Sequence, residues 1–391
     1  MFRPFDVLTA VVLCAGHFSF CVWAYNRLHA GVLPHPVVKV IDRIAAVCSL
    51  ALFAGYLAFW ARTGMLVAPW DSADLFGIWL RVHAALCLFA VIAVFPAWIW
   101  PRLTFRQTPA LAGNHSTVID LGEHLPEKPV HGARSRLYAR LPGNQILKLG
   151  IHEKELRLPN WPAELDGFSL VHLSDLHMTG KLTRPFYEEV CREAQKLNGD
   201  LIVATGDIAE EAECLPWIAE TFGRLRGNLG QMFILGNHEL RLPQPALLRQ
   251  ALVDAGWEDL GGRRREVQFN GRSICLAGSE RPWFGVEPPE CPATSAAKIL
   301  LAHTPDLFGW AQRRRFDLML AGHTHGGQIR LPLIGPLIAP SRFGFRYASG
   351  VFEEGPTVMH VSRGLSGEHL LRFNCPPELA KLVIRRQGET R

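Results

Sequence analysis

The first hundred residues contain three long stretches without a single charged side chain. These stretches are Val7 to Ala24, Ile44 to Ala61 and Val82 to Pro101. Each is close to the ~20 apolar residues with which a helix crosses a bilayer. The alternative is a buried helical bundle, but its helices would carry a polar face, and here few residues besides His17, Ser49 and His83 are polar. We therefore predict a membrane region at residues 1–103 with three transmembrane helices.

Basic residues near the ends of these stretches predict the orientation. Arg3, Arg62 and Arg81 fall on one side of the membrane, and Arg27, Lys39, Arg43, Arg102 and Arg106 fall on the other. Because cytoplasmic loops are enriched in Lys and Arg, five against three favours a cytoplasmic C-terminal region. No small-X-small cleavage site follows the first stretch, so we expect it to persist. These features predict a multi-pass protein of the bacterial inner (cytoplasmic) membrane.

Cysteine spacing points to the same compartment. Of the nine cysteines, five lie beyond the apolar stretches: Cys191, Cys214, Cys275, Cys291 and Cys375. Their spacing matches neither a zinc site nor a disulfide framework, which suits a reducing environment. The net charge of +5 is modest, and the arginine triplets at 263–265 and 313–315 are typical of solvated faces, so no nucleic-acid partner is expected.

Hydrophobic periodicity is lost after the membrane region and then returns. Residues 104–135 gather Pro, Gly, His and charge, which indicates a linker. Gln145 to Leu158 alternates like a half-buried strand, so a globular domain is predicted at 136–391. Helix-compatible stretches at 184–197 and 244–255 alternate with short apolar runs, which predicts an α/β domain.

Within this domain a short apolar run is followed at once by Asp, Asn or His five times. The runs end before Asp175 and His177, before Asp207, before Asn237 and His238, before His303, and before His323 and His325. Ligands of open α/β sheets bind beyond the carboxyl ends of strands, so these side chains are expected to meet in one cavity. For any one motif, an ordinary polar residue at a strand end is an adequate alternative explanation.

Oxygen and nitrogen ligands without a thiolate point to two divalent ions rather than a structural zinc or an iron–sulfur cluster. The candidate set is Asp175, His177, Asp207, Asn237, His303, His323 and His325. Seven ligands are too many for one tetrahedral zinc and suit two ions that share a carboxylate. Two such ions activate water and neutralise phosphoryl oxygens, which is the chemistry of phosphoester hydrolysis.

The ordered motifs Asp-X-His, Gly-Asp, Gly-Asn-His-Glu, His and Gly-His-X-His resemble the calcineurin-like metallophosphoesterase superfamily. The resemblance covers about residues 140–391 and implies a four-layer α/β/β/α sandwich with two mixed sheets. It implies that Asp175, His177 and His325 bind one metal, that Asn237, His303 and His323 bind the other, and that Asp207 bridges them. His238 would face the substrate as a catalytic residue, and Glu239 would orient a ligand. The metals expected are manganese, with iron or zinc as alternatives.

Further segments resemble the membrane-associated bacterial phosphodiesterase branch of this superfamily. They include His323 to Leu331 and Val361 to Gly364. That branch contains a UDP-2,3-diacylglucosamine pyrophosphatase of lipid A synthesis, so the resemblance implies a phosphorylated, acylated substrate and contact with membrane lipids. The alternatives are a soluble phosphodiester substrate and a non-catalytic scaffold. A scaffold should have lost ligands, and a transporter should carry charges in its apolar stretches.

Two apolar stretches flank the predicted site in the sequence. Pro282 to Val286 precedes His303, and Leu331 to Ile338 follows the last histidine pair. Their Pro and Gly residues make regular helices or central strands unfavourable, so we expect loops. Exposed apolar loops mark a membrane or ligand contact, which favours a substrate drawn from the membrane. Packing of these loops against their own domain is the alternative.

Overall fold

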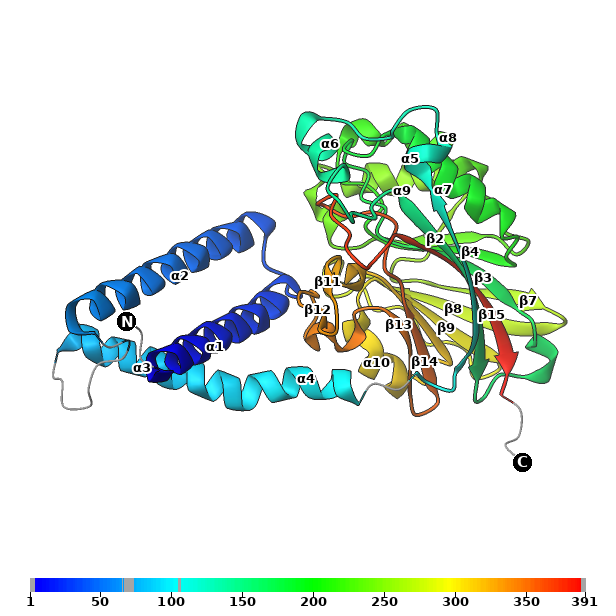
Figure 1. Cartoon of the computed structure of the whole chain (residues 1–391). Helices are drawn as coiled ribbons and strands as arrows, with labels where there is room; N and C mark the ends of the chain where they lie inside the picture. Colours follow the sequence, from blue (N-terminus) through cyan, green and yellow to red (C-terminus); the bar gives the residue numbers. More distant parts are fainter. Residues whose placement is uncertain (1–3, 65, 67–73, 105–106, 388–391) are drawn as a thin grey trace. The chain divides into compact units, whose positions relative to one another are not determined.

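A computed structural model describes residues 4–64, 66, 74–104 and 107–387 of this chain (Figure 1). The chain divides into two compact units, Met1–Phe105 and Arg106–Arg391. Each unit has its own core, and each is described separately below.

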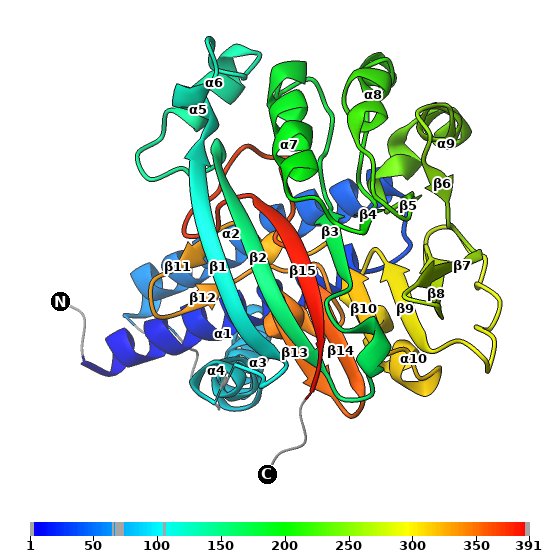
Figure 2. The ribbon, with the colours of Figure 1, turned by 90° about the vertical axis from the view of Figure 1, so that its right-hand side faces the viewer.

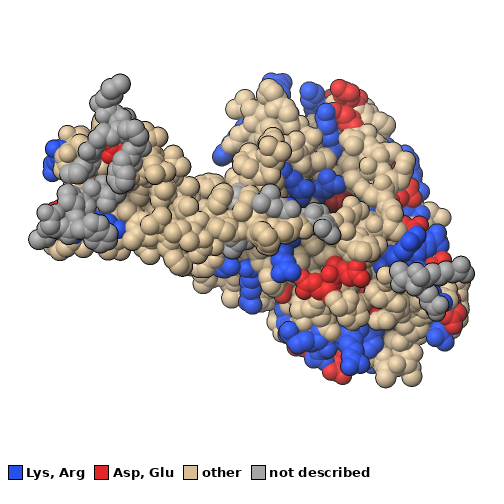
Figure 3. Space-filling model, turned by 60° about the horizontal axis from the view of Figure 1, so that its bottom comes forward, with Lys and Arg blue, Asp and Glu red and all other residues tan. Residues whose placement is uncertain are grey.

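The first unit consists of apolar helices. They are α1 (Pro4–His29), α2 (His35–Thr63), α3 (Leu75–Phe89), a π-helical turn η1 (Ala90–Val94) and α4 (Phe95–Leu103). Three segments are long and apolar enough to cross a membrane, Asp6–His29, His35–Thr63 and Leu75–Val94. The middle of this unit shows neither acidic nor basic side chains on the face in view in Figure 3. The prediction of three apolar helices is confirmed, although the third begins at Leu75 rather than at Val82.

The few polar residues of these helices contact one another. His17 Nε2 lies 2.9 Å from Ser49 Oγ, and His17 Nδ1 lies 3.3 Å from His83 Nε2. The hydroxyl of Tyr56 lies 2.8 Å from His83 Nδ1. Unsatisfied polar groups are costly in hydrocarbon, so this cluster joins α1, α2 and α3 by satisfying each member within the unit.

The second unit contains two mixed sheets (Figure 2). The first sheet has seven strands in the order β1 (Leu111–Asp120), β2 (Lys148–Leu158), β15 (Glu378–Arg386), β3 (Ser169–Leu173), β4 (Leu201–Thr205), β5 (Gln231–Ile234) and β6 (Glu258–Asp259). The second has six in the order β13 (Gly350–Glu354), β14 (Thr357–Val361), β10 (Leu318–Ala321), β9 (Ala297–Ala302), β8 (Arg272–Ser279) and β7 (Arg264–Phe269). Strands β3 to β6 are parallel to one another, as are β8, β9, β10 and β14.

Helices and a small hairpin complete this unit. The helices are α5 (Leu121–His124), α6 (Ala133–Ala139), α7 (Arg184–Lys196), α8 (Trp217–Glu220), α9 (Pro245–Asp254) and α10 (Phe308–Arg313). The hairpin pairs β11 (Arg330–Leu331) with β12 (Gly335–Pro336). The predicted helices at 184–197 and 244–255 correspond to α7 and α9.

Three apolar layers hold the sheets and helices together. On β3, Leu170 belongs to the core between the two sheets, and its neighbour Val171 belongs to the core beneath α7, α8 and α9. A third core lies between the second sheet and α10, where Met319 packs with Phe308. Strands buried on both faces lack alternation, which is why β10 is a continuous apolar run. The predicted four-layer α/β/β/α sandwich is therefore confirmed.

Two predictions from the sequence are wrong. Residues 104–135 are not simply a linker, because β1 pairs antiparallel with β2 at the edge of the first sheet. Most of β1 is exposed, so its sequence carries no alternating apolar signal. In addition, Cys275 and Cys291 form a disulfide across sixteen residues of sequence separation. The cysteines therefore give no support for a reducing compartment.

Candidate metal centre

The predicted site residues follow the carboxyl ends of five strands. Asp175 and His177 follow β3, Asp207 follows β4, Asn237 follows β5, His303 follows β9, and His323 and His325 follow β10. Five of them adopt left-handed backbone conformations, with φ of 53° at Asp175, 46° at His177, 53° at Asp207, 70° at His323 and 52° at His325. Non-glycine residues in this region cost about 1–3 kcal/mol each and concentrate at functional sites. The loops are thus built to aim side chains rather than to minimise backbone strain.

Two glycines allow these loops to approach one another. A Cβ atom on Gly236 would lie 2.4 Å from Oδ1 of Asp207 and 2.6 Å from the ring of His303. A Cβ atom on Gly322 would lie 1.9 Å from Ser174 Oγ and 2.4 Å from Oδ2 of Asp175. All four distances are shorter than the contacts that real Cβ atoms make, so only glycine fits at either position.

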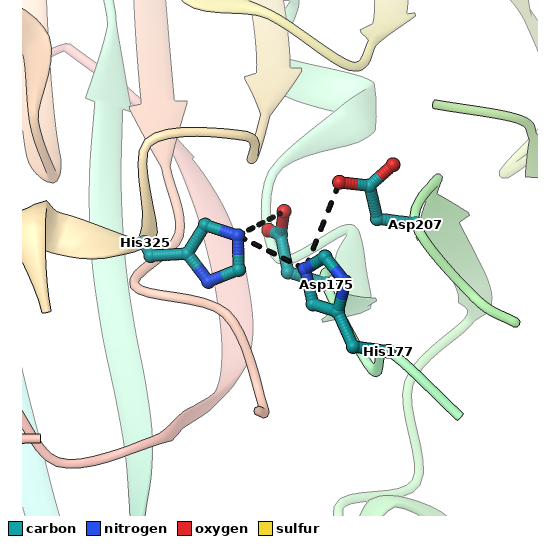
Figure 4. A group of neighbouring side chains, drawn as sticks. All are labelled: Asp175, His177, Asp207 and His325. Carbon is teal, nitrogen blue, oxygen red and sulfur yellow. Dashed lines mark hydrogen bonds and ion pairs between the residues drawn. The ribbon is translucent and has the colours of Figure 1, made fainter. Parts of the chain in front are cut away.

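One group of ligand atoms forms where β3, β4 and β10 end (Figure 4). It contains Asp175, His177, Asp207 and His325, whose ligand atoms lie within 4.8 Å of one another. The Nε2 atoms of His177 and His325 are 3.0 Å apart, and His325 Nε2 is 3.5 Å from Oδ1 of Asp175. Oδ2 of Asp207 lies 3.7 Å from His177 Nε2. These separations suit four atoms arranged around one ion.

A second group shares the same carboxylate. Oδ2 of Asp207 lies 3.2 Å from Nε2 of His303, and that nitrogen lies 3.1 Å from Oδ1 of Asn237. His323 joins Asp207 and His303 in this group. Asp207 is therefore the member common to both groups, the position that a bridging ligand occupies.

Hydrogen bonds orient three of the rings in the same way. Nδ1 of His177 lies 2.5 Å from Glu210, Nδ1 of His303 lies 2.7 Å from the carbonyl of Thr205, and Nδ1 of His325 lies 3.3 Å from the carbonyl of Ser366. A ring whose Nδ1–H donates to an acceptor presents its Nε2 lone pair, as metal-ligating histidines do. All three Nε2 atoms belong to the two groups above.

The charge state of the site also suits a cation. Burial lowers the pKa of His325 to about 3, and burial and His303 hold the pKa of His323 well below its usual range, so both imidazoles are neutral. Burial opposes protonation of His303, but the Asp207 carboxylate raises its pKa to about 9. His323 and His325 are therefore neutral donors, and a divalent ion beside Asp207 would displace the proton that this carboxylate favours on His303.

Among the buried polar side-chain atoms of the described residues that have no hydrogen-bond partner, two belong to the proposed ligand groups, and they test whether metals fit. They are Oδ2 of Asp207, which is common to both groups, and Nε2 of His323, which belongs to the second. Buried polar groups are nearly always paired, so each such exception needs an explanation. A cation in each group would supply the missing partner, and the residues present therefore fit two divalent ions.

Uncharged hydrogen-bond donors contact the carboxylate of Asp175. The hydroxyl of Ser174 donates to Oδ2 at 2.6 Å, and the backbone N–H of His323 donates to Oδ1 at 2.9 Å. A buried polar chain continues from Ser174 between the two sheets, through Thr205, His172, His360, Lys154 and Glu378. This chain fixes the carboxylate without adding charge beside it.

His238 lies next to the two groups but is positioned differently from their members. Its side chain is 13% exposed, its Nε2 is 3.9 Å from Oδ2 of Asp207, and its Nδ1 is 2.9 Å from Oε1 of Glu210. Glu210 therefore contacts the rings of both His238 and His177. Glu239 contacts backbone instead, accepting from the N–H groups of Gly236 at 2.6 Å and Asp207 at 3.1 Å.

Glu210 is the site residue that the sequence did not reveal. Its Oε1 faces both His177 and His238, and its Oε2 accepts from Arg241 at 2.6 Å. His177 and His238 lie on different loops, so Glu210 links the first group of ligand atoms to His238. It follows Asp207 by three residues and no apolar run immediately precedes it, so the strand-end pattern could not identify it.

The two apolar stretches predicted to flank the site differ in exposure. Trp283 lies over the second group, with its ring centroid 4.9 Å from that of His323 and 5.5 Å from that of His303. Phe284 packs against the core beneath α9. The stretch 331–338 instead exposes most of its apolar side chains, and Leu333 is fully exposed.

These two groups, on two mixed sheets between helical layers, define the metal centre of a metallophosphoesterase. Residues 168–327 match the family model of the calcineurin-like phosphoesterases, so the chain contains a calcineurin-like phosphoesterase domain. This confirms the resemblance drawn from the motifs. The family is one of hydrolases that use divalent metals, which supports hydrolase activity here.

Several relatives agree with this assignment. The chain is 29% identical to the uncharacterized metallophosphoesterase YkuE of Bacillus subtilis over 57% of this chain and 81% of the relative. It is 28% identical to the phosphodiesterase YaeI of Escherichia coli over 56% and 82%. A more distant relative, at 23% identity over 57% and 85%, is the UDP-2,3-diacylglucosamine pyrophosphatase LpxG of Chlamydia muridarum.

The position of Glu210 generates a prediction. Glu210→Gln keeps the size of the side chain but weakens the contacts that orient His177 and His238. We expect metal affinity, measured by chelator competition, or kcat/KM to fall about 10- to 100-fold, as when the partner of a ligating histidine is removed. The neighbouring Glu211 is exposed, so Glu211→Gln is the matched control. If both variants behave like the parent protein, Glu210 has no orienting role.

Proposed function

We propose that this chain is a membrane-anchored, dinuclear metal-dependent phosphohydrolase that cleaves a phosphodiester or pyrophosphate bond. The observation that carries the proposal is the buried oxygen of Asp207, which two groups of ligand atoms share and which has no hydrogen-bond partner among the described residues. Asp175, His177 and His325 would hold one ion with Asp207, and Asn237, His303 and His323 would hold the other. Such an O and N donor set suits Mn²⁺, which we propose ahead of iron and zinc.

The protein would supply the positioning and the proton. Two bound ions would lower the pKa of a coordinated water and neutralise negative charge on the phosphoryl group. His238 is the imidazole beside this centre that is absent from the proposed ligand set, and it is partly exposed. We propose that Glu210 accepts from His238 Nδ1–H, so that Nε2 is left to donate a proton to the leaving oxygen.

The proposed substrate is lipid-linked, such as UDP-2,3-diacylglucosamine. Three apolar helices in the same chain support it, because they tie the domain to a membrane. The relationship to LpxG supports the nucleotide-lipid pyrophosphate class in particular. A soluble phosphodiester is the competing substrate. The relationship to the phosphodiesterase YaeI supports cleavage of a phosphodiester.

Orientation is part of the same proposal. The excess of basic residues on one side favours a cytoplasmic domain in a bacterial inner membrane. The Cys275–Cys291 disulfide is the observation that favours the opposite side, because disulfides persist in oxidising compartments.

The direct test is hydrolysis by the purified full chain. With Mn²⁺ present, we expect turnover of UDP-2,3-diacylglucosamine and of a generic aryl phosphodiester. Asp207→Ala should abolish turnover of both and reduce bound metal, because the loss of a shared carboxylate weakens both sites. Asp254→Ala, at the exposed end of α9, is the control and should match the parent. Two retained metal ions with parental activity in Asp207→Ala would overturn the dinuclear assignment.

His238→Ala separates proton transfer from metal binding. We expect bound metal to remain at the parental level while kcat falls by about 10² to 10⁴, the usual contribution of a general acid. Metal analysis and kcat should be measured on the same preparation. A loss of metal in this variant would instead assign His238 to the ligand set.

Topology can be read from the C-terminus. A reporter fused after Arg391 should report the cytoplasm. A reporter active only outside the cytoplasm would reverse the orientation. That result would also argue against a substrate made in the cytoplasm.

A further inference from the structure

The β11–β12 hairpin carries a cluster of apolar side chains that the domain does not bury. Leu333 at its tip is fully exposed, and Ile334, Ile338, Ile329 and Leu331 are 37%, 44%, 41% and 39% exposed. We define these five residues as the hairpin patch. Monomeric soluble proteins rarely expose apolar side chains in such continuity, and contiguous patches mark a contact surface.

The hairpin has regular antiparallel pairing and is anchored to the domain at its base. Arg330 pairs with Pro336 and Leu331 with Gly335 across the two strands. The backbone N–H of Arg330 donates to the carbonyl of Phe373 at 2.9 Å, and its Nε–H donates to the carbonyl of Gly326 at 2.8 Å. The base of the hairpin is therefore fixed while its tip remains exposed.

The same base contacts the metal loop. A Cβ atom on Gly327 would lie 2.4 Å from Cβ of Pro336 and 2.9 Å from the carbonyl oxygen of Ile338. Gly327 is two residues after His325, so the hairpin packs directly on the loop that carries a candidate ligand. A surface that contacts the hairpin therefore lies near the loop that carries His325.

The chain between the two units is short, which limits what the hairpin patch can contact. Helix α4 ends at Leu103 and β1 begins at Leu111. Eight residue steps extend to at most about 29 Å, so the domain cannot move further than this from the end of the helical unit. If the three apolar helices cross a membrane, the bilayer lies within reach of the domain, whereas a soluble partner would have to be recruited.

A basic residue that follows the hairpin closely in the sequence favours lipid in particular. Arg342 and Phe343 come shortly after Ile338, and both are exposed, Phe343 to 44%. A basic side chain next to exposed aromatic and aliphatic groups suits an anionic headgroup above acyl chains. We propose that the hairpin patch inserts into the bilayer surface and holds the loop that carries His325 close to the membrane. This proposal does not depend on the reaction proposed above.

The test is photocrosslinking of the full chain in vesicles of phosphatidylethanolamine and phosphatidylglycerol. A benzophenone amino acid replaces Leu333, whose side chain is fully exposed and can be changed without disturbing the core. The matched control replaces Leu247, a 52% exposed apolar residue on α9. We expect illumination to attach labelled phospholipid at position 333 at least tenfold more efficiently than at position 247.

Three outcomes decide the proposal. Lipid attachment at position 333 supports it. Attachment of position 333 to the helices of the same chain, or to a second copy, would overturn it, as would equal labelling at the two positions. Combining the Leu333 replacement with Asp207→Ala should leave lipid attachment unchanged, so failure of the catalytic proposal and failure of the membrane contact can be told apart.

Discussion

The site depends on the burial of one carboxylate oxygen that the imidazole nitrogens of His177, His238 and His303 surround. Oδ2 of Asp207 is fully buried, and burial by itself favours the protonated form of this carboxyl group. His303 and His238 oppose that effect and hold the pKa of Asp207 well below its usual range. A buried negative charge is tolerated only when it is paired or coordinates a metal. Since this oxygen belongs to two groups of ligand atoms, the simplest compensation is a cation on each side of it.

The surrounding structure holds that oxygen in place at some cost. Left-handed backbone at Asp207, Asp175 and three histidines would relax if the loops were free. They are fixed by glycines that permit close approach, by Glu239 on the backbone of the Asp207 loop, and by the polar chain behind Asp175. The two sheets bring these loops together, because the parallel strands β3, β4 and β5 in one sheet and β9 and β10 in the other end on the same side of the sandwich.

Much of this arrangement was predictable because it follows from strand ends. Apolar runs followed at once by Asp, Asn or His, with helical stretches between them, predict an α/β domain and the convergence of side chains from Asp175 to His325. The two-sheet sandwich was implied by the family resemblance. What the sequence could not provide depends on three-dimensional packing. Glu210 has no strand directly before it, β1 is an exposed edge strand without apolar alternation, and the Cys275–Cys291 pair has no diagnostic spacing. The contact of His17, Ser49 and His83 likewise depends on how three helices pack.

A dinuclear site would require Asp207 to bind both cations. Crystals of the full chain grown with Mn²⁺ and measured at an X-ray energy where manganese scatters anomalously would test this most directly. We expect two anomalous peaks about 3.5–4 Å apart, both within bonding distance of Asp207, one beside His177 and His325 and the other beside His303 and His323. A single peak, or two peaks of which only one contacts Asp207, would contradict it.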